Sequence, residues 1–315
     1  MASTTLSPAL LNRLRMRQVT LLLAIEVHGT LHAASTALGM TQPAATKMLH
    51  ALEDTLGQTL FDRIGRGLQI NSAGLCVTHY FKGLRGSMQV LTRELEALRL
   101  GSAGKLLIGS IMAASPAHLT DALIRLKTLF PLMAVEIAVG TSDRLMEQLH
   151  EGVLDLVIGR LPALGNAGMN PDYAFAPIAD EALSVVVSIA HPLADGRQVI
   201  FKDLLHYPWI LQPTGSPMRE VIEQEFKARH VPLPRGLIET ASILTTTNLI
   251  ARTEMIAVIP QSIAGRYAQH GLLRIVPYAI SHHLAAYGSI VRKDRPVSAA
   301  AQAFLELLHV QEPRS

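Results

Sequence analysis

Hydrophobic and polar positions follow a helical period through the first part of the chain. Residues 15–29, RMRQVTLLLAIEVHG, carry their apolar side chains on one stripe, which predicts a helix. A second helix is predicted over residues 31–38 with Thr30 as its cap. A third is predicted from Gln42 with Thr41 as its cap, just after a turn at Gly39 and Met40. Two helices joined by a short turn that contains glycine form a helix-turn-helix.

The predicted third helix begins with TQPAATK, residues 41–47, so small side chains dominate its front end. In a helix-turn-helix, this end enters the major groove of DNA, where the amide of Gln42 can pair with an adenine edge. Lys47 and the free N–H groups of both helix starts can reach phosphates. An ordinary helical hairpin with a proline in its first turn is the alternative. The predicted DNA contacts of the two helices are Thr30, Thr41, Gln42, Pro43, Ala44, Thr46 and Lys47.

A basic β-hairpin is predicted next to these helices. Residues 57–71, GQTLFDRIGRGLQIN, alternate in polarity around a turn that contains two glycines. Arg63 and Arg66 flank the turn and are expected to lie along phosphates or to enter the minor groove. Such a hairpin is the wing of a winged helix, although two solvated surface arginines are the alternative.

A long helix is predicted from Asn71 or Ser72, either of which can cap it, to about Leu100. Its apolar residues recur with spacings of four and three over three heptads, which is typical of a helix that pairs with a second copy of itself. The alternative is a core helix within one chain. We expect a homodimer that presents two reading helices to DNA with two-fold character. The predicted dimer seam consists of Val77, Phe81, Leu84, Met88, Leu91, Leu95 and Leu98.

The string HAASTALGMTQPAATKMLHALEDTLGQTLFDRIGRG, residues 32–67, resembles the LysR-type transcriptional regulators, and the resemblance extends over nearly the whole chain. The branch that includes regulators of galactose-binding-protein and protocatechuate genes is the most similar, as HPLA at residues 191–194 and YPWIL at 207–211 indicate. The resemblance implies a winged helix-turn-helix, a dimerising linker helix, a two-lobed effector-binding domain and tetramers built as pairs of dimers. Two departures, Ala45-Thr46 and Asn71, keep the capping and phosphate-binding chemistry.

Strands and helices alternate through the remaining residues, which predicts an α/β fold in two lobes like that of periplasmic binding proteins. The expected domains are an all-α winged helix-turn-helix at 12–70, a linker helix at 71–101 and an effector-binding domain at 104–315. Lobe 1 is expected at about 104–174 plus 278–315, and lobe 2 at about 175–277.

Several predicted strands of these lobes end where a helix begins with Ser or Thr, as in SPAHL and SPMREV. Ligands of open α/β sheets lie beyond the carboxyl ends of the strands, and helix N-termini there favour anions. We therefore expect a small, anionic effector between the lobes, such as an aromatic acid, a sugar or a sugar acid. The alternative is that these residues merely cap their helices. The predicted effector contacts are Ser115, Thr141, Ser142, Arg160, Pro213, Thr214, Ser216, Thr240 and Ser242.

Charge and composition narrow the choice of function. Residues 1–100 hold 10 Lys and Arg against 6 Asp and Glu, so the basic surplus accompanies the predicted DNA-binding part. The chain has a single cysteine, Cys76, and shows no signal-peptide pattern, which favours a cytoplasmic protein. It also has no long apolar run, so no membrane span is predicted. A periplasmic solute-binding protein fits the last 210 residues alone, but the helix-turn-helix argues against it.

An enzyme on the same α/β scaffold is the third class. The chain contains no G-x-S-x-G elbow, no phosphate-binding P-loop and no cysteine cluster for zinc. No catalytic residue, metal site or cofactor is predicted. The favoured function is therefore a transcriptional regulator that a small molecule switches.

Overall fold

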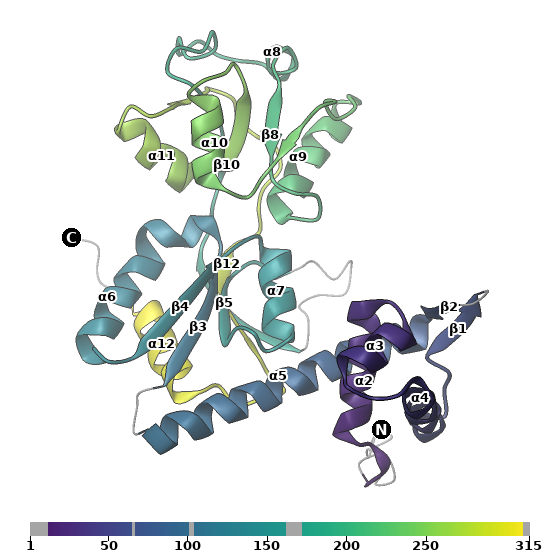
Figure 1. Cartoon of the computed structure of the whole chain (residues 1–315). Coiled ribbons are helices and arrows are strands. Elements are labelled where there is room, and N and C mark those ends of the chain that lie inside the picture. The colour runs from purple at the N-terminus through teal and green to yellow at the C-terminus, as the bar shows by residue number, and fades with distance from the viewer. Residues whose placement is uncertain (1–11, 65–66, 101–103, 162–171, 311–315) are drawn as a thin grey trace, which may run out of the picture. The chain divides into compact units, whose positions relative to one another are not determined.

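The computed structural model describes residues 12–64, 67–100, 104–161 and 172–310. The chain forms two compact units, residues 1–89 and 90–315, and the long helix α5 contributes to both (Figure 1). Among the described residues, no helix is long and apolar enough to cross a membrane. Each unit is described by itself below.

The first unit is a bundle of helices with a two-stranded hairpin. Its helices pack around a core in which Leu22, Ala34 and Leu60 are fully buried. The hairpin strands pair in antiparallel register from Phe61 with Ile70 to Ile64 with Gly67. The elements are α2 (Met16–His28), α3 (Leu31–Ala37), α4 (Gln42–Leu56), β1 (Phe61–Ile64), β2 (Gly67–Ile70) and the first part of α5 (Ser72–Leu100).

The start of α5 is fixed against the hairpin. Asn71 is the cap, because its side-chain oxygen accepts a hydrogen bond from Gly74 N at 2.9 Å while its Nδ2 donates to Thr59 O at 3.0 Å. A Cβ atom at Gly74 would lie 2.2 Å from Leu60 O, so only glycine fits this crossing. The predicted choice between Asn71 and Ser72 as cap is thereby decided for Asn71.

The predicted seam of α5 falls into two parts with different surroundings. Phe81 is 6% exposed and belongs to the core of the first unit, and Val77 and Leu84 pack against that core. Phe81 therefore packs within its own chain, whereas contacts of Val77 and Leu84 with a second copy remain predictions. Three further seam residues stay exposed: Met88 at 44%, Leu91 at 47% and Leu95 at 56%. The side chain of Leu98 lies outside the described part of the structure.

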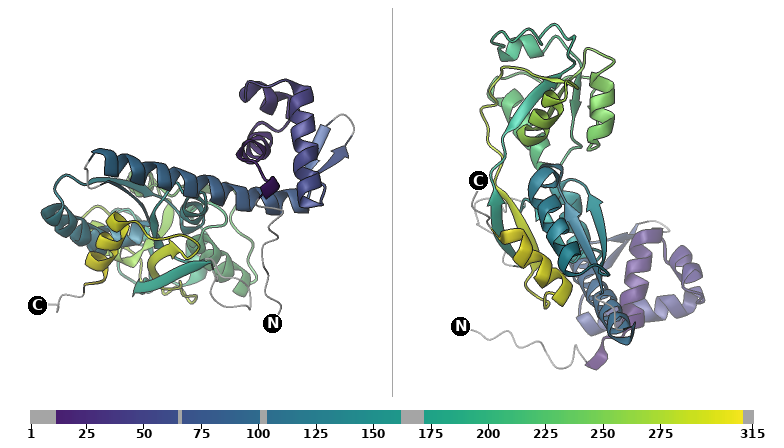
Figure 2. Two further views of the ribbon diagram at one scale, coloured as in Figure 1. Left: turned by 90° about the horizontal axis from the view of Figure 1, so that it is seen from below. Right: turned by 90° about the vertical axis from the view of Figure 1, so that its left-hand side faces the viewer.

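Lobe 1 of the second unit is a five-stranded sheet with strand order β4-β3-β5-β12-β6. β3 pairs parallel with β4 and β5, whereas β12 pairs antiparallel with β5 and β6. Helix α7 covers one face, and α12, drawn in yellow, lies beside α6 on the other (Figures 1 and 2). The elements are β3 (Lys105–Ser110), α6 (Thr120–Leu129), β4 (Ala134–Val139), α7 (Ser142–His150), β5 (Leu156–Gly159), β6 (Tyr173–Ala179), β12 (Tyr287–Arg292) and α12 (Ala299–His309).

Lobe 2 is a second five-stranded sheet, ordered β11-β7-β10-β8-β9. Alternation along β7 places Val185 and Val187 in one core cluster with α8 and α9, and Val186 in another with α10 and α11. Both faces of the sheet are therefore covered. The elements are β7 (Leu183–Val187), α8 (Phe201–Leu204), β8 (Trp209–Leu211), α9 (Pro217–Ala228), β9 (Ile238–Glu239), α10 (Ile243–Ile250), β10 (Ile256–Pro260), α11 (Gln261–Gln269) and β11 (Arg274–Ile275).

Two chain segments join the lobes, and both change lobe later than predicted. β6 pairs with β12 in lobe 1, so the first crossover is residues 180–182 and not a point near residue 175. Val276 belongs to a core cluster of lobe 2, and Tyr278 and Leu284 pack against it, so the second crossover is residues 276–286. The predicted limits follow runs of apolar residues, and such runs do not reveal which sheet a strand joins.

Candidate functional site

The front of α4 is an exposed surface with one long polar side chain and one cation. Gln42, Pro43, Ala44 and Lys47 are all exposed, so they are free to meet a partner. Ala45 is fully buried in the core of the first unit, and its small size serves the packing of the helix rather than access to a groove. The amide of Gln42, which both donates and accepts hydrogen bonds, is therefore free to meet a base edge.

Three threonines of the predicted DNA interface have different roles. Thr30 caps α3, since its Oγ1 accepts a hydrogen bond from Ala33 N at 3.1 Å. Thr41 occupies the cap position of α4, but its side chain makes no capping hydrogen bond, which corrects the predicted side-chain cap. The hydroxyl of Thr46 donates to Gln42 O at 3.0 Å, and its predicted contact with DNA remains a prediction.

A groove of about 530 Å³ runs along the exposed face of α4 and contains a residue that the sequence-based prediction missed. Its lining includes Pro43, Lys47, His50 and Asp54, which lie on one face of the helix because they are three or four residues apart. This spacing is visible in the sequence and could have identified His50. Asp54 ends the face with a negative charge, which is unfavourable next to a phosphate.

The wing residues are described in part. Arg63 belongs to β1, whose hairpin partner is β2. The side chain of Arg63 and the whole of Arg66 lie outside the described residues, so their predicted contacts with phosphates remain predictions.

The second candidate site is a cleft where the strand ends of lobe 1 meet the helix starts of lobe 2. Its lining contains Thr141 and Ser142 at the start of α7, Arg160 after β5, and Gln212 and Met218 on either side of the start of α9. The structure thus brings together predicted residues that lie far apart in the chain. The cavity holds ≈ 20 Å³, which is room for about one water molecule.

Arg160 is the central charged group of this cleft and is only 3% exposed. Its backbone N donates to Ser142 Oγ at 3.1 Å, and its Nε donates to Ala285 O, on the second crossover, at 2.8 Å. The guanidinium carbon lies 5.6 Å from the ring centre of Tyr287, but Nη2 has no hydrogen-bond partner among the described residues. Burial lowers the pKa of Arg160, while the Glu181 carboxylate opposes this shift.

Two helix N-termini lie beside Arg160. Ser216 is 1% exposed and caps α9, because its Oγ accepts a hydrogen bond from Arg219 N at 3.3 Å. Thr141 occupies the cap position of α7, whose first residue is Ser142, but the side chain of Thr141 makes no capping hydrogen bond. Instead of capping α7, the hydroxyl of Ser142 holds the backbone of Arg160.

The structure does not gather every predicted effector residue into the cleft. Ser242 is exposed and caps α10, and Thr240 accepts a hydrogen bond from Ser242 N at 3.0 Å, so both serve their own loop. Pro213 and Thr214 form the turn before α9 and do not line the cavity. Ser115 is the first residue of a short π-helical turn and not its cap, and its side chain lies outside the described part.

Comparison with known proteins assigns both parts of the chain to one family. Residues 16–75 match the bacterial regulatory helix-turn-helix of the lysR family, and residues 99–311 match the LysR substrate binding domain. The chain is also 35% identical to the HTH-type transcriptional regulator GbpR of Azospirillum brasilense over 94% of this chain and 86% of that protein. This chain belongs to the LysR family. The predicted family, its branch and the function as a transcriptional regulator are confirmed.

Solved structures of LysR-family regulators share the fold. Full-length CbnR, crystallised in complex with its target DNA, aligns with a TM-score of 0.59 at 21% identity over 94% of this chain and 99% of that chain. The effector-binding domain of QuiR in complex with shikimate aligns with a TM-score of 0.55 at 19% identity over 66% of this chain and 96% of that chain. The predicted fold class is confirmed. The chain is a LysR-family transcriptional regulator with a DNA-binding helix-turn-helix and an effector-binding domain.

Proposed function

We propose that a small anionic effector binds between lobes 1 and 2 at Arg160 and thereby switches DNA binding by this regulator. The supporting observation is the guanidinium of Arg160, which is 3% exposed and keeps Nη2 without a hydrogen-bond partner among the described residues. A buried donor of this kind is unfavourable unless a ligand completes it. A carboxylate matches a guanidinium in charge and geometry.

The surroundings of Arg160 support the same class of ligand. The N-termini of α7 and α9 flank the cleft, and the free N–H groups of helix starts stabilise negative charge. Shikimate, which the related QuiR domain binds, is a carboxylate as well. Aromatic acids and sugar acids are therefore the first candidates, and neutral sugars are less suited to this particular cleft.

The small volume of the cleft indicates how an effector can enter it. Ligand pockets typically hold about 300–1,000 Å³, whereas this cleft holds ≈ 20 Å³. We infer that lobes 1 and 2 must separate before an effector enters. Because Arg160 Nε holds the backbone of the second crossover, an effector that repositions this side chain also acts on the connection between the lobes.

The effector proposal is tested with matched charged and neutral compounds on the full chain. Benzoate with benzamide and gluconate with sorbitol form pairs that differ in the carboxylate, and thermal shift followed by calorimetry measures their binding. We expect an anion to bind, and Arg160→Met to weaken its binding about 10- to 100-fold, the effect of a charge-assisted hydrogen bond.

The matched control is Arg144→Met on the exposed part of α7, where Arg144 pairs with Glu147 at the surface. This substitution removes one positive charge outside the cleft lining and should leave the affinity unchanged. Equal losses in both variants, or stabilisation by the neutral member of each pair, would contradict the proposal.

For DNA binding we propose separate tasks for two exposed residues of α4. Gln42 reads a base edge in the major groove through its amide, and Lys47 binds phosphate. The operator is expected to have two-fold character because a symmetric dimer presents two copies of α4. Arg63 and Arg66 of the wing are proposed to add phosphate or minor-groove contacts.

These tasks predict different binding profiles for two alanine variants. Gln42→Ala should relax the preference at one operator position by about 1–3 kcal/mol and leave binding to random DNA unchanged. Lys47→Ala should weaken binding to all sequences alike and reduce the salt slope by about one. Titrations against a library of single-base operator variants at several salt concentrations measure both effects, with Lys105→Ala in lobe 1 as the charge control. A uniform loss in both variants would show that Gln42 is not the reader.

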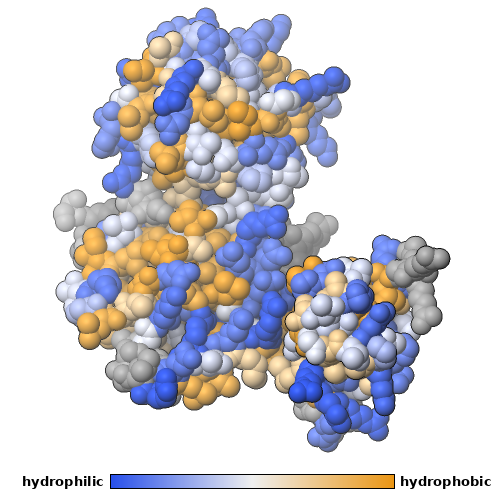
Figure 3. All heavy atoms as spheres, viewed as in Figure 1, coloured by the Kyte–Doolittle hydropathy of each residue, from blue (hydrophilic) through white to orange (hydrophobic). Residues whose placement is uncertain are grey.

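We propose that the regulator assembles as a homodimer, and further as a tetramer built from two dimers. Figure 3 shows apolar side chains gathered over α6 and the edge strand β4. Ile124, Leu132 and Val139 are 62%, 92% and 66% exposed there, and an uncovered edge strand with such residues favours association. The exposed part of the α5 seam, at Met88, Leu91 and Leu95, offers a second surface. Sedimentation of the full chain distinguishes the dimer from the tetramer.

We further propose three functional parts with the expected limits: a DNA-binding domain at 12–70, a linker helix at 71–101 and an effector-binding domain at 104–315. The boundaries between lobes 1 and 2 lie at the two crossovers, residues 180–182 and 276–286. An ion pair supports a connection between the linker and lobe 1, since Arg93 of α5 contacts Asp155 at 2.9 Å. The proposed location is the cytoplasm, where the target DNA lies.

A further inference from the structure

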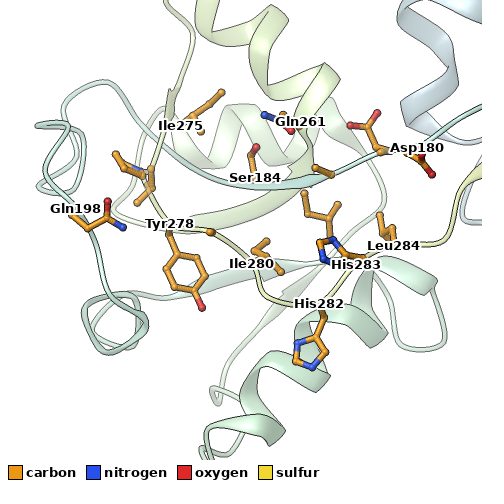
Figure 4. A pocket seen from close by; sticks show the side chains of 16 residues that line it. Asp180, Ser184, Gln198, Gln261, Ile275, Tyr278, Ile280, His282, His283 and Leu284 are labelled. Carbon is orange, nitrogen blue, oxygen red and sulfur yellow. The ribbon is translucent and has the colours of Figure 1, made fainter.

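A trough of ≈ 710 Å³ lies between the two crossovers, on the lobe 2 side, and is separate from the Arg160 cleft. The first crossover and the start of β7 contribute Asp180, Glu181 and Ser184, and the second contributes the segment that contains Ile280 and His283. Figure 4 shows Gln198 and Asp180 toward opposite ends of this trough, with Ser184 and Ile280 between them. Its volume lies in the range of small-molecule sites.

We call this space between the two crossovers the hinge trough. The charged groups that line it are negative, whereas the Arg160 cleft carries a positive charge. Among the described residues that line it, two are carboxylates, Asp180 and Glu181, and none is Lys or Arg. A carboxylate or phosphate ligand would meet like charge here without a compensating cation. The trough therefore suits an anion less well than the Arg160 cleft does.

The remaining polar side chains offer hydrogen-bond donors as well as acceptors. Gln198 and Gln261 are exposed amides, each with both functions. Figure 4 shows the ring of His283 on one side of the second crossover, while Tyr278 and His282 turn to the other side, where both bond Glu225. An amine ligand would use only the acceptors, whereas hydroxyl groups use donors and acceptors together.

The apolar part of the lining fits the same class of ligand. Ile280 and Leu284 are half-buried and lie on the second crossover, opposite the acidic residues of the first. An apolar surface of this size can cover the C–H face of a sugar ring while the amides and carboxylates meet its hydroxyls. We propose that the hinge trough binds a neutral, polyhydroxylated small molecule of about monosaccharide size.

The position of the trough gives such a ligand a regulatory effect. Both crossovers are already anchored to lobe 2, because Glu181 accepts hydrogen bonds from Ser262 N and Oγ at 3.1 and 2.6 Å and Glu225 holds the backbone of His282. A ligand that touches both crossovers adds a bridge between the two segments that must move when the lobes separate. It consequently changes the affinity of the anion at Arg160, and the anion changes its affinity by the same factor.

The first experiment is calorimetry on the full chain with D-galactose, D-glucose, D-ribose and sorbitol as probes. Putrescine serves as the amine and benzoate as the anion. At least one polyol is expected to bind the wild type and to bind Arg160→Met equally well. No binding of any of these polyols at millimolar concentration, or binding of putrescine alone, would overturn the proposal.

Variants of the trough test its location. Ala279→Trp places a large side chain on an exposed lining residue and is expected to abolish polyol binding. Gln198→Ala and Asp180→Asn are each expected to weaken it about 3- to 10-fold, the effect of one hydrogen bond. Gln302→Ala on the exposed side of α12 is the matched control. Polyol binding that survives Ala279→Trp but disappears in Arg160→Met would place the polyol in the cleft and refute the trough.

Discussion

Two buried charged side chains of the effector-binding domain differ in how their hydrogen-bonding groups are satisfied. Glu225 of α9 is 1% exposed, and Arg160 after β5 is 3% exposed. Removing either charge from water is costly, so each needs compensation. The two residues receive it in different ways, and the difference separates a structural charge from one that is available to a ligand.

Glu225 is fully surrounded by donors from two segments of lobe 2. Its carboxylate accepts hydrogen bonds from Tyr278 Oη at 3.0 Å and from His282 N at 3.0 Å, and it also bonds Ser281 N, the ring of His282 and Arg229. These contacts tie the second crossover to α9. Glu225 therefore acts as an anchor of the fold, and its charge is already compensated within the chain.

Arg160 contrasts with this arrangement because one arm of its guanidinium has no partner. Its Nε is bonded to Ala285 O at 2.8 Å, whereas Nη2 is buried without a hydrogen bond among the described residues. A side chain kept in this state costs stability in the absence of ligand. The comparison distinguishes the charge of Glu225, whose hydrogen bonds lie within the chain, from the charge of Arg160, one donor of which is open to the proposed effector.

The largest expected effect is on stability and distinguishes the two residues directly. Glu225→Leu leaves several donors of the second crossover without an acceptor, so we expect the free energy of unfolding to fall by about 3 kcal/mol. Arg160→Met replaces an incompletely bonded charge by an apolar group of similar length and should change it by less than about 1 kcal/mol, or raise it. Urea denaturation of both variants measures the difference. The free energy of unfolding of Glu225→Gln, which keeps the shape of the side chain, should lie between those of the other two variants. Equal losses of stability in Glu225→Leu and Arg160→Met would contradict the distinction between a structural charge and one available to a ligand.

The pH dependence of stability should carry the signature of Glu225. Burial alone would raise its pKa, but the hydrogen bonds from His282, Tyr278 and Ser281 outweigh this effect and hold the pKa below its ordinary value of 4.5. A carboxyl whose pKa is lowered by folding contributes stability above its unfolded pKa, and this contribution disappears as the pH falls through the folded pKa. The wild type should therefore lose stability faster than Glu225→Gln below about pH 4.5. Parallel curves of unfolding free energy against pH would contradict the role of Glu225 as an ionised anchor.

Local patterns in the sequence predicted much of the fold. The spacing of apolar residues identified the helix-turn-helix, and the caps Thr30, Ser216 and Ser242 lie where Ser and Thr before a helix start indicated. The alternating strands and helices identified the two lobes. These features depend on residues within a few positions of one another, and one sequence is enough to show them.

The features that the sequence did not predict correctly depend on contacts between residues far apart in the chain. The heptad pattern of α5 could not show that Phe81 closes the core of the first unit, because that core forms only when α2 and α4 pack against it. The pattern of strand 173–179 did not indicate that it joins β12 of lobe 1. Arg160 was predicted as an effector contact, but the sequence could not show its buried state, in which it bonds Ser142 and Ala285, 18 and 125 residues away along the chain.

The smallest expected effect tests whether the donors of Glu225 act together. Tyr278→Phe removes one hydroxyl from the anchor and keeps the ring, so it should cost about 0.5–1.5 kcal/mol, the net value of a single hydrogen bond. In Glu225→Gln the same change should cost less, since a neutral acceptor forms a weaker bond than a carboxylate. A double-mutant cycle in urea measures this coupling. If the cost of Tyr278→Phe were the same in both backgrounds, the hydroxyl would stabilise the crossover independently of Glu225, and the anchor would consist of the backbone, histidine and arginine donors alone.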